Sequence, residues 1–224
     1  MWVKICGTTS EDDALLAVAM GADAVGFIFA PSKRQVAPSH VADIVKRLPP
    51  EVVTVGVFRD ESPSRVAQIV LHAGLQGAQL HGHESPADTA RVHERVRFLI
   101  KAFPAGDQRV RRAGEWGADA VMLDAPSAGS GQVFDWALTG ELPSHQRLVI
   151  AGGLTPANVA AAIDATAPWG VDVATGVERS PGQKDPVKLR EFIAAAKAAG
   201  SRLPAEAPPA DPGVGPYDWQ EDRA

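Results

Sequence analysis

The only cysteine of the chain, Cys6, stands where a short apolar run meets Gly7. A glycine next to a side chain lets the backbone turn and a ligand approach closely. The unperturbed pKa of a thiol is about 8.5, so positive surroundings can make it a base near neutral pH. A free cysteine is just as often a small buried apolar residue. Cys6 taken alone leaves both interpretations open.

Other ionisable side chains follow later apolar runs. Asp124 ends Val-Met-Leu-Asp, and His81 stands in Gln-Leu-His-Gly. Arg34, Arg59 and Asp60 follow two further runs. Each has an ordinary alternative role, since aspartate often caps a loop, histidine often makes structural hydrogen bonds, and loop arginines are often solvated. If all these runs end on one face of a sheet, their ionisable groups form a set suited to proton transfer.

Two glycine-containing segments could bind an anion. The first contains Gly152 and Gly153, and the second contains Thr175 and Gly176. Paired glycines bring backbone N–H groups close to a ligand, and such loops often hold phosphate. A single Gly-Gly pair is usually a turn. Two such loops near the end of the chain favour a phosphate site.

Short apolar runs alternate with helical patterns along the chain, which predicts buried parallel strands joined by helices. The predicted helices include residues 12–20, 64–73 and 157–167. The predicted strands cover residues 2–5, 24–29, 52–57, 77–80, 98–102, 120–123, 147–150 and 171–173.

An internal repeat indicates how these strands are arranged. Gly-Ala-Asp-Ala-Val occurs at residues 21–25 and again at 117–121, with looser copies at 74–78 and 170–173. Each copy follows a helix and opens an even-numbered strand. Four such units predict an α/β fold, a closed (βα)8 TIM barrel, whose reactive groups lie at the carboxyl ends of the strands. An open doubly wound sheet is the alternative, but its glycine-rich fingerprint after the first strand is missing.

Composition restricts the partners. The chain has 224 residues, a formal net charge of −5 and no block of basic residues, so we expect neither nucleic acid nor membrane as a partner. No apolar stretch is long enough to span a bilayer, which favours a soluble cytoplasmic protein. The spacing of His72, His83, His93 and His145 gives no metal motif.

The end of the chain differs from the rest. Residues 1–200 are predicted to form the barrel, whereas residues 201–224 are rich in proline and lack periodicity. We therefore expect a disordered tail, in which Tyr217 and Trp219 are the residues that could dock.

Taken together, the motifs resemble the phosphoribosylanthranilate isomerase family of tryptophan biosynthesis. The match runs in family order from Val3 to Ala199. Its pieces are Lys4-Ile5-Cys6-Gly7, Gly26-Phe27-Ile28-Phe29 with Ser32 and Arg34, Val55-Gly56-Val57-Phe58, Gln79-Leu80-His81-Gly82, Leu123-Asp124, Gly129-Ser130-Gly131 with Phe134-Asp135-Trp136, Ala151-Gly152-Gly153-Leu154, and Gly176-Val177-Glu178 with Gly182, Lys184 and Asp185.

This resemblance implies an Amadori rearrangement of N-(5-phosphoribosyl)anthranilate to 1-(2-carboxyphenylamino)-1-deoxyribulose 5-phosphate, without cofactor or metal. It implies that Cys6 is the general base and Asp124 the general acid. Arg34 would bind the anthranilate carboxylate. His81, Gly152, Gly153, Thr175 and Gly176 would also bind the substrate, the last four around its phosphate. The protein would be a monomer or a homodimer.

Two positions depart from the family pattern. The segment that usually reads Ser-Ser-Gly-Val-Glu is Ala-Thr-Gly-Val-Glu at residues 174–178, which keeps a hydroxyl at Thr175. An acidic residue often found after Gln-Leu-His-Gly is replaced by His83.

The sequence alone is also compatible with other functions. A non-catalytic phosphate-binding barrel is one, and another sugar-phosphate enzyme of the same fold is a second. An indole-glycerol-phosphate synthase needs catalytic lysines, for which Lys101 is the arguable candidate. The related histidine-pathway isomerase has a carboxylate where Cys6 stands.

Overall fold

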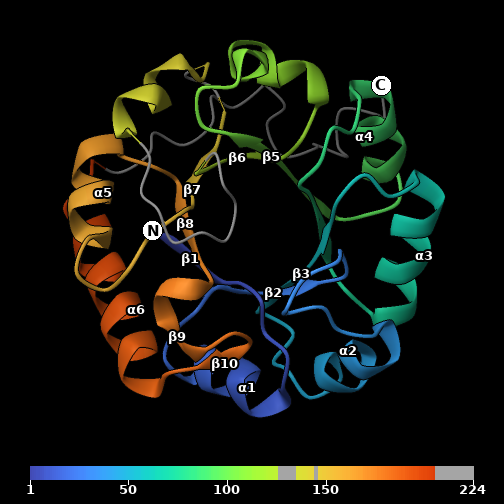
Figure 1. Cartoon of the computed structure of the whole chain (residues 1–224), viewed down its shortest axis with the longest axis horizontal. Helices are drawn as coiled ribbons and strands as arrows, with labels where there is room; N and C mark the ends of the chain where they lie inside the picture. The colour runs from blue at the N-terminus through green and yellow to red at the C-terminus, as the bar shows by residue number, and fades with distance from the viewer. Residues whose placement is uncertain (126–134, 144–145, 205–224) are drawn as a thin grey trace, which may run out of the picture.

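Eight parallel strands close into a barrel in the order of the sequence, and the last strand pairs with the first. Figure 1 looks down this barrel, with the helices arranged around it. The computed structural model describes residues 1–125, 135–143 and 146–204. The predicted (βα)8 barrel is therefore confirmed. Its strands are β1 (Trp2–Ile5), β2 (Ala24–Ile28), β3 (Val53–Phe58), β4 (Gly77–Leu80), β5 (Phe98–Pro104), β6 (Ala120–Asp124), β7 (Leu148–Ile150) and β8 (Gly170–Val173).

Within the described ranges of the chain, six α-helices and three 3-10 helices connect or follow these strands. In the described part of the chain, the 3-10 helices η1 (Gln108–Trp116) and η2 (Trp136–Glu141) follow β5 and β6 in place of α-helices. After β8 comes a two-stranded ribbon that the sequence did not reveal, β9 (Glu178–Ser180) with β10 (Gln183–Lys184). The helices are α1 (Glu11–Ala19), α2 (Pro38–Val45), α3 (Pro63–Ala73), α4 (Pro86–His93), η1 (Gln108–Trp116), η2 (Trp136–Glu141), α5 (Val159–Thr166), η3 (Thr175–Val177) and α6 (Pro186–Gly200).

Three of the helices start in the same way. A Ser or Asp side chain accepts backbone N–H groups of the first turn, and proline follows it at the first helical position. This satisfies N–H groups that have no partner inside the helix, and proline loses no hydrogen bond there. The pairs are Ser62-Pro63, Ser85-Pro86 and Asp185-Pro186.

The internal repeat has a structural counterpart. Asp23 accepts the backbone N–H of Val3 at 2.7 Å, and Asp119 accepts that of Leu99 at the same distance. Each aspartate thus ties the start of an even-numbered strand to the preceding strand. The two best copies of the repeat therefore hold β1–β2 and β5–β6 in the same way.

The main apolar core joins side chains of the strands to those of the surrounding helices. None of the helices in the described part of the chain has the length and apolar character of a membrane span. Ordered structure continues past residue 200. Arg202 donates to Asp164 at 2.8 Å and Leu203 packs against the core. The rest of the predicted tail, including Tyr217 and Trp219, lies outside the described residues, as do Gly129-Ser130-Gly131 and Phe134.

Candidate active site

A cavity of about 480 Å³ opens at the carboxyl ends of the strands, within the roughly 300–1,000 Å³ typical of small-molecule sites. Four of the predicted site residues line it, namely Cys6, Arg34, His81 and Asp124. A smaller cavity of about 60 Å³ adjoins it, and Asp124, Asp172 and Ala174 line both. The fold therefore brings the predicted acid, base and carboxylate-binding residue around one space.

Cys6 follows β1 and is 5% exposed. Burial raises the pKa of its thiol, and the positive charges of Lys4 and Lys184 lower it only in part. Gly26 of β2 makes room for this arrangement. A Cβ atom there would lie 3.0 Å from the Cys6 Sγ and 3.1 Å from the Lys4 Nζ. A larger residue at this position would separate the thiol from the ammonium.

Lys4 is fully buried inside the barrel. Its Nζ donates to Oδ1 of Asp172 at 2.7 Å and to Oε1 of Gln79 at 2.9 Å. The ammonium and the Cys6 thiol both lie against Gly26 of β2. Burial opposes the charge, but Asp172 and Cys6 outweigh it, so the pKa of Lys4 is raised. A stable positive charge consequently lies beside Cys6.

Asp124 ends β6 and is nearly buried. Its Oδ1 accepts the backbone N–H of Ala125 at 2.8 Å, and its Oδ2 lies 3.3 Å from Nε2 of His81. The other ring nitrogen of His81, Nδ1, is 2.9 Å from Nε2 of Gln79. His81 thus contacts the candidate acid as well as the cavity.

Arg34 reaches the cavity from the segment after β2, but part of its guanidinium is already bonded. Its Nε and Nη2 donate to the two carboxylate oxygens of Glu178 at 2.8 and 2.7 Å, and Nη2 also donates to Thr175. Burial alone would raise the pKa of Glu178, yet Arg34 and Lys184 hold it below its usual value. Glu178 therefore fixes the direction in which Arg34 points.

Gly7 leaves the space in which Arg34 lies. Its φ is +68°, and a Cβ atom there would lie 2.5 Å from the Cδ of Arg34. Any other residue would be strained and would push Arg34 aside. The glycine next to Cys6 thus contributes to the placement of a different site residue.

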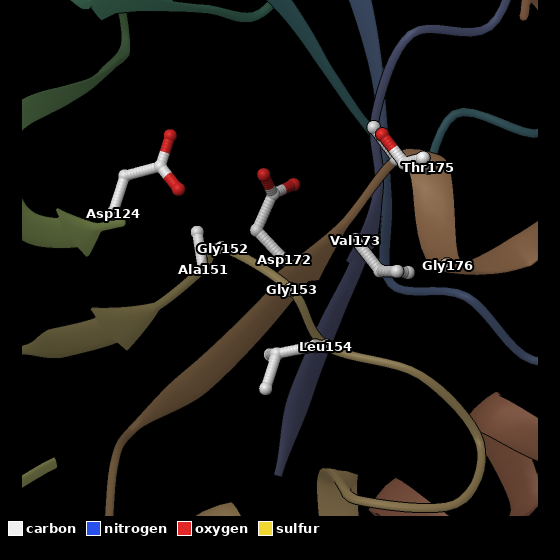
Figure 2. A pocket seen from close by; sticks show the side chains of 10 residues that line it. Asp124, Ala151, Gly152, Gly153, Leu154, Asp172, Val173, Thr175 and Gly176 are labelled. Atoms are coloured by element: carbon white, nitrogen blue, oxygen red, sulfur yellow. The ribbon is translucent and has the colours of Figure 1, made fainter. Parts of the chain in front are cut away.

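The smaller cavity is formed by the loops after β7 and β8, as expected for a phosphate site. Gly152, Gly153, Thr175 and Gly176 all line it. Figure 2 shows the residues that line this smaller cavity, among them the carboxylate side chains of Asp124 and Asp172. Within residues 1–125, 135–143 and 146–204, the N–H groups of Gly152 and Gly153 donate to no protein acceptor. They suit an anion, and the charge of Asp172 is balanced by Lys4.

Lys101, the candidate lysine of the alternative function, does not line either cavity. It is fully buried, donates to Oε2 of Glu84 at 2.7 Å and to the carbonyl of Gly82 at 2.8 Å. Burial lowers its pKa, and Glu84 offsets this in part. These contacts give Lys101 a structural role. Among the described residues, no group of His, Cys, Asp and Glu side chains is arranged to hold a metal ion.

Several polar residues of the site were assigned no role from the sequence, although four of the five stand in the motifs quoted above. A usable signal exists for two of them, because side chains two apart on a strand point the same way. Lys4 and Cys6 are two apart near β1, and Gln79 and His81 are two apart near β4. A lysine inside an apolar run was therefore an unused indication. The missed residues are Lys4, Gln79, Asp172, Glu178 and Lys184.

Comparison with known proteins agrees with this site. The sequence profile of the family "N-(5'phosphoribosyl)anthranilate (PRA) isomerase" matches residues 3–195. A relative named N-(5'-phosphoribosyl)anthranilate isomerase, from Desulforudis audaxviator, is 50% identical over 204 residues, which are 88% of this chain and 98% of the relative.

Solved structures give the same result. Phosphoribosyl anthranilate isomerase from Thermus thermophilus has a TM-score of 0.83 and 40% identity, over 88% of this chain and 99% of that one. A second structure, of the isomerase in complex with reduced 1-(o-carboxyphenylamino)-1-deoxyribulose 5-phosphate, has a TM-score of 0.78 and 39% identity over the same shares. The chain belongs to the N-(5'-phosphoribosyl)anthranilate isomerase family.

Proposed function

We propose that this protein converts N-(5-phosphoribosyl)anthranilate into 1-(2-carboxyphenylamino)-1-deoxyribulose 5-phosphate, a step of tryptophan biosynthesis, with Asp124 as general acid and Cys6 as general base. The observation that carries the proposal is that the two side chains line one cavity from β6 and β1, on strands that are not neighbours in the barrel. An acid and a base so separated can act on two atoms of one substrate.

Ring opening comes first. Asp124 gives its proton to the ring oxygen of the ribose, the bond from this oxygen to C1 breaks, and the anthranilate nitrogen supplies electrons to form an iminium ion. Asp124 is left as a carboxylate, which the N–H of Ala125 stabilises. The substrate's own nitrogen acts as the electron source, so this step calls for no cofactor.

Cys6 then removes the proton from C2, which the iminium has made acidic. The electrons of the C–H bond form an enolamine, and this tautomerises to the ketone of the product. Lys4 stabilises the thiolate that this step needs, since the positive charge of its buried ammonium lowers the pKa of the thiol. Each proton transfer contributes about 10²- to 10⁴-fold in rate.

The remaining residues recognise the two ends of the substrate. The loops with Gly152–Gly153 and Thr175–Gly176 suit the phosphate, remote from the reacting carbons. Arg34 keeps Nη1 for the anthranilate carboxylate, because Nε and Nη2 are held by Glu178. His81 lines the larger cavity and lies 3.3 Å from Asp124, so in this proposal it binds the sugar of the substrate next to the general acid.

We expect this small phosphorylated molecule, and neither nucleic acid nor membrane, as the partner. Cytoplasmic location and a monomeric or homodimeric state remain predictions, the latter to be measured by sedimentation.

Turnover of the synthetic substrate tests the function, read by the loss of anthranilate fluorescence. The wild-type protein should convert it, and Cys6→Ala should convert it at least about 10²-fold more slowly. Binding of substrate without turnover would indicate a non-catalytic phosphate-binding barrel. Turnover of only the histidine-pathway substrate would assign the protein to that related isomerase.

A further inference from the structure

A row of polar side chains crosses the interior of the barrel from the candidate base to the candidate acid. The Lys4 ammonium and the Cys6 thiol both lie against Gly26 at one end, and His81 is 3.3 Å from Asp124 at the other. Gln79 joins the two, 2.9 Å from Lys4 Nζ through Oε1 and 2.9 Å from His81 Nδ1 through Nε2. Gln79 is 1% exposed, so water does not replace either contact.

The chemistry of Lys4 decides which way the Gln79 amide points. An ammonium group only donates hydrogen bonds, so the amide oxygen must face Lys4. The NH₂ group then faces His81, and its second hydrogen points to the Sδ of Met122 at 3.3 Å. The reversed amide would place NH₂ against an ammonium, which is repulsive.

This orientation in turn decides the tautomer of His81. An NH₂ group donates, so Nδ1 of His81 must accept and carries no hydrogen. The ring hydrogen of the neutral imidazole is therefore on Nε2, the atom 3.3 Å from Oδ2 of Asp124. The hydrogen bond that one ring nitrogen makes sets the state of the other.

We infer that Gln79 is a positioning residue for the reaction. Lys4 fixes its amide, and Gln79 in turn holds His81 in the tautomer that carries its hydrogen on Nε2, the ring nitrogen next to Asp124. The consequence lies in the ring-opening step. When Asp124 gives up its proton, its Oδ1 already accepts the N–H of Ala125, and the Nε2–H of His81, 3.3 Å from its Oδ2, is close enough to become a second donor. Donors aimed at charge that develops during a reaction lower its barrier.

This inference rests on the proposed function for its catalytic part, but its structural part can be measured without substrate. The test is the ¹⁵N–¹H correlation spectrum of the histidine side chains at a pH where His81 is neutral, with His81 assigned by its loss in His81→Asn. Wild-type protein should show Nδ1 without hydrogen and Nε2 with it. The opposite tautomer in the wild type would overturn the proposal outright.

Gln79→Glu is the informative variant. Its carboxylate still accepts from Lys4 but cannot donate to His81, so Nδ1 of His81 should gain a hydrogen. We expect kcat to fall about 10²-fold, with little change in KM. Gln76→Glu is the matched control, since it adds the same charge just before the same strand, where the Gln76 side chain donates to the exposed carbonyl of Pro50. It should change neither the His81 spectrum nor kcat.

Gln79→Met covers the case in which the added charge prevents folding. It removes both contacts and keeps the length and neutrality of the side chain. His81 should then lose its single tautomer, and kcat should fall. An unchanged His81 spectrum in whichever of Gln79→Glu and Gln79→Met is folded would refute the proposal. If the wild type shows the expected tautomer but does not turn over substrate, the proposed function fails and the positioning by Gln79 stands.

Discussion

Arg34 donates both Nε–H and an Nη2–H to the carboxylate of Glu178, so the side of its guanidinium that matches a carboxylate best is already occupied. Two parallel hydrogen bonds of this kind are strong and set the orientation of the plane. Arg34 therefore meets a ligand through Nη1 from a fixed direction. The pair is 12% and 3% exposed, so its geometry is held by the surrounding protein.

Arg34 should decide recognition of the anthranilate carboxylate. Arg34→Ala should weaken substrate binding by roughly 1.5–3 kcal/mol, because a charge-assisted hydrogen bond is lost. Arg34→Lys should also weaken binding, because lysine cannot form the paired hydrogen bonds to Glu178 that orient Arg34. The loss should be smaller than in Arg34→Ala, because lysine keeps the positive charge. The measurement compares KM for the substrate and for a phosphoribosyl aniline that lacks the carboxylate. If wild type and Arg34→Ala discriminate equally between the two, another group binds the carboxylate.

Cys6→Ala should lower kcat by at least about 10²-fold, because the base that removes the C2 proton is lost. Binding of substrate and the melting temperature should change little, as the removed sulfur is small. Steady-state kinetics and thermal unfolding on the same preparation check this. A variant that is less stable yet turns over normally would show that Cys6 serves packing alone.

The pH dependence of kcat/KM should reflect the raised pKa of the Cys6 thiol. A base acts when deprotonated, so a thiol pKa raised by burial means that activity increases as pH rises through the alkaline range, above the pKa of an ordinary thiol. Cys6→Asp places a group of much lower intrinsic pKa there, and the same limb should move to lower pH. A limb that stays in place in Cys6→Asp would belong to another group.

Asp124→Asn should be at least as damaging to kcat as Cys6→Ala. An amide keeps the shape and accepts the N–H of Ala125 but has no proton to give to the ring oxygen. Rapid-mixing experiments should find the ring-closed substrate bound and unchanged. Near-normal kcat would exclude Asp124 as the acid.

Removal of residues 205–224 should leave kcat, KM and the melting temperature close to those of the full chain, because this segment has no core-forming pattern. Ending the chain at Gly200 should lower stability slightly more, since it also removes Leu203 and the exposed Arg202–Asp164 pair. A large rise in KM after removal of residues 205–224 alone would instead assign Tyr217 or Trp219 to the site.

The sequence alone was sufficient for the fold and for the position of the main candidates along the chain. Alternating apolar runs and helical patterns reflect local periodicity, and the Gly-Ala-Asp repeat reflects a local contact made in each unit. Strand limits differed from prediction by a residue or two; β3, for example, is Val53–Phe58 and not 52–57. Because parallel strands end on one face, Cys6, His81 and Asp124 followed from counting strand ends.

Only the tertiary structure decided how these residues are bonded. Lys4 pairs with Asp172, which is 168 positions away, and Arg34 pairs with Glu178, which is 144 positions away. Closing the barrel brings β8 beside β1 and sets Lys4 opposite Asp172 in register. No local pattern encodes such a contact, because it depends on the strands meeting around the ring. The burial that raises the thiol pKa and the hydrogen bonds that orient Gln79 arise from the same closure.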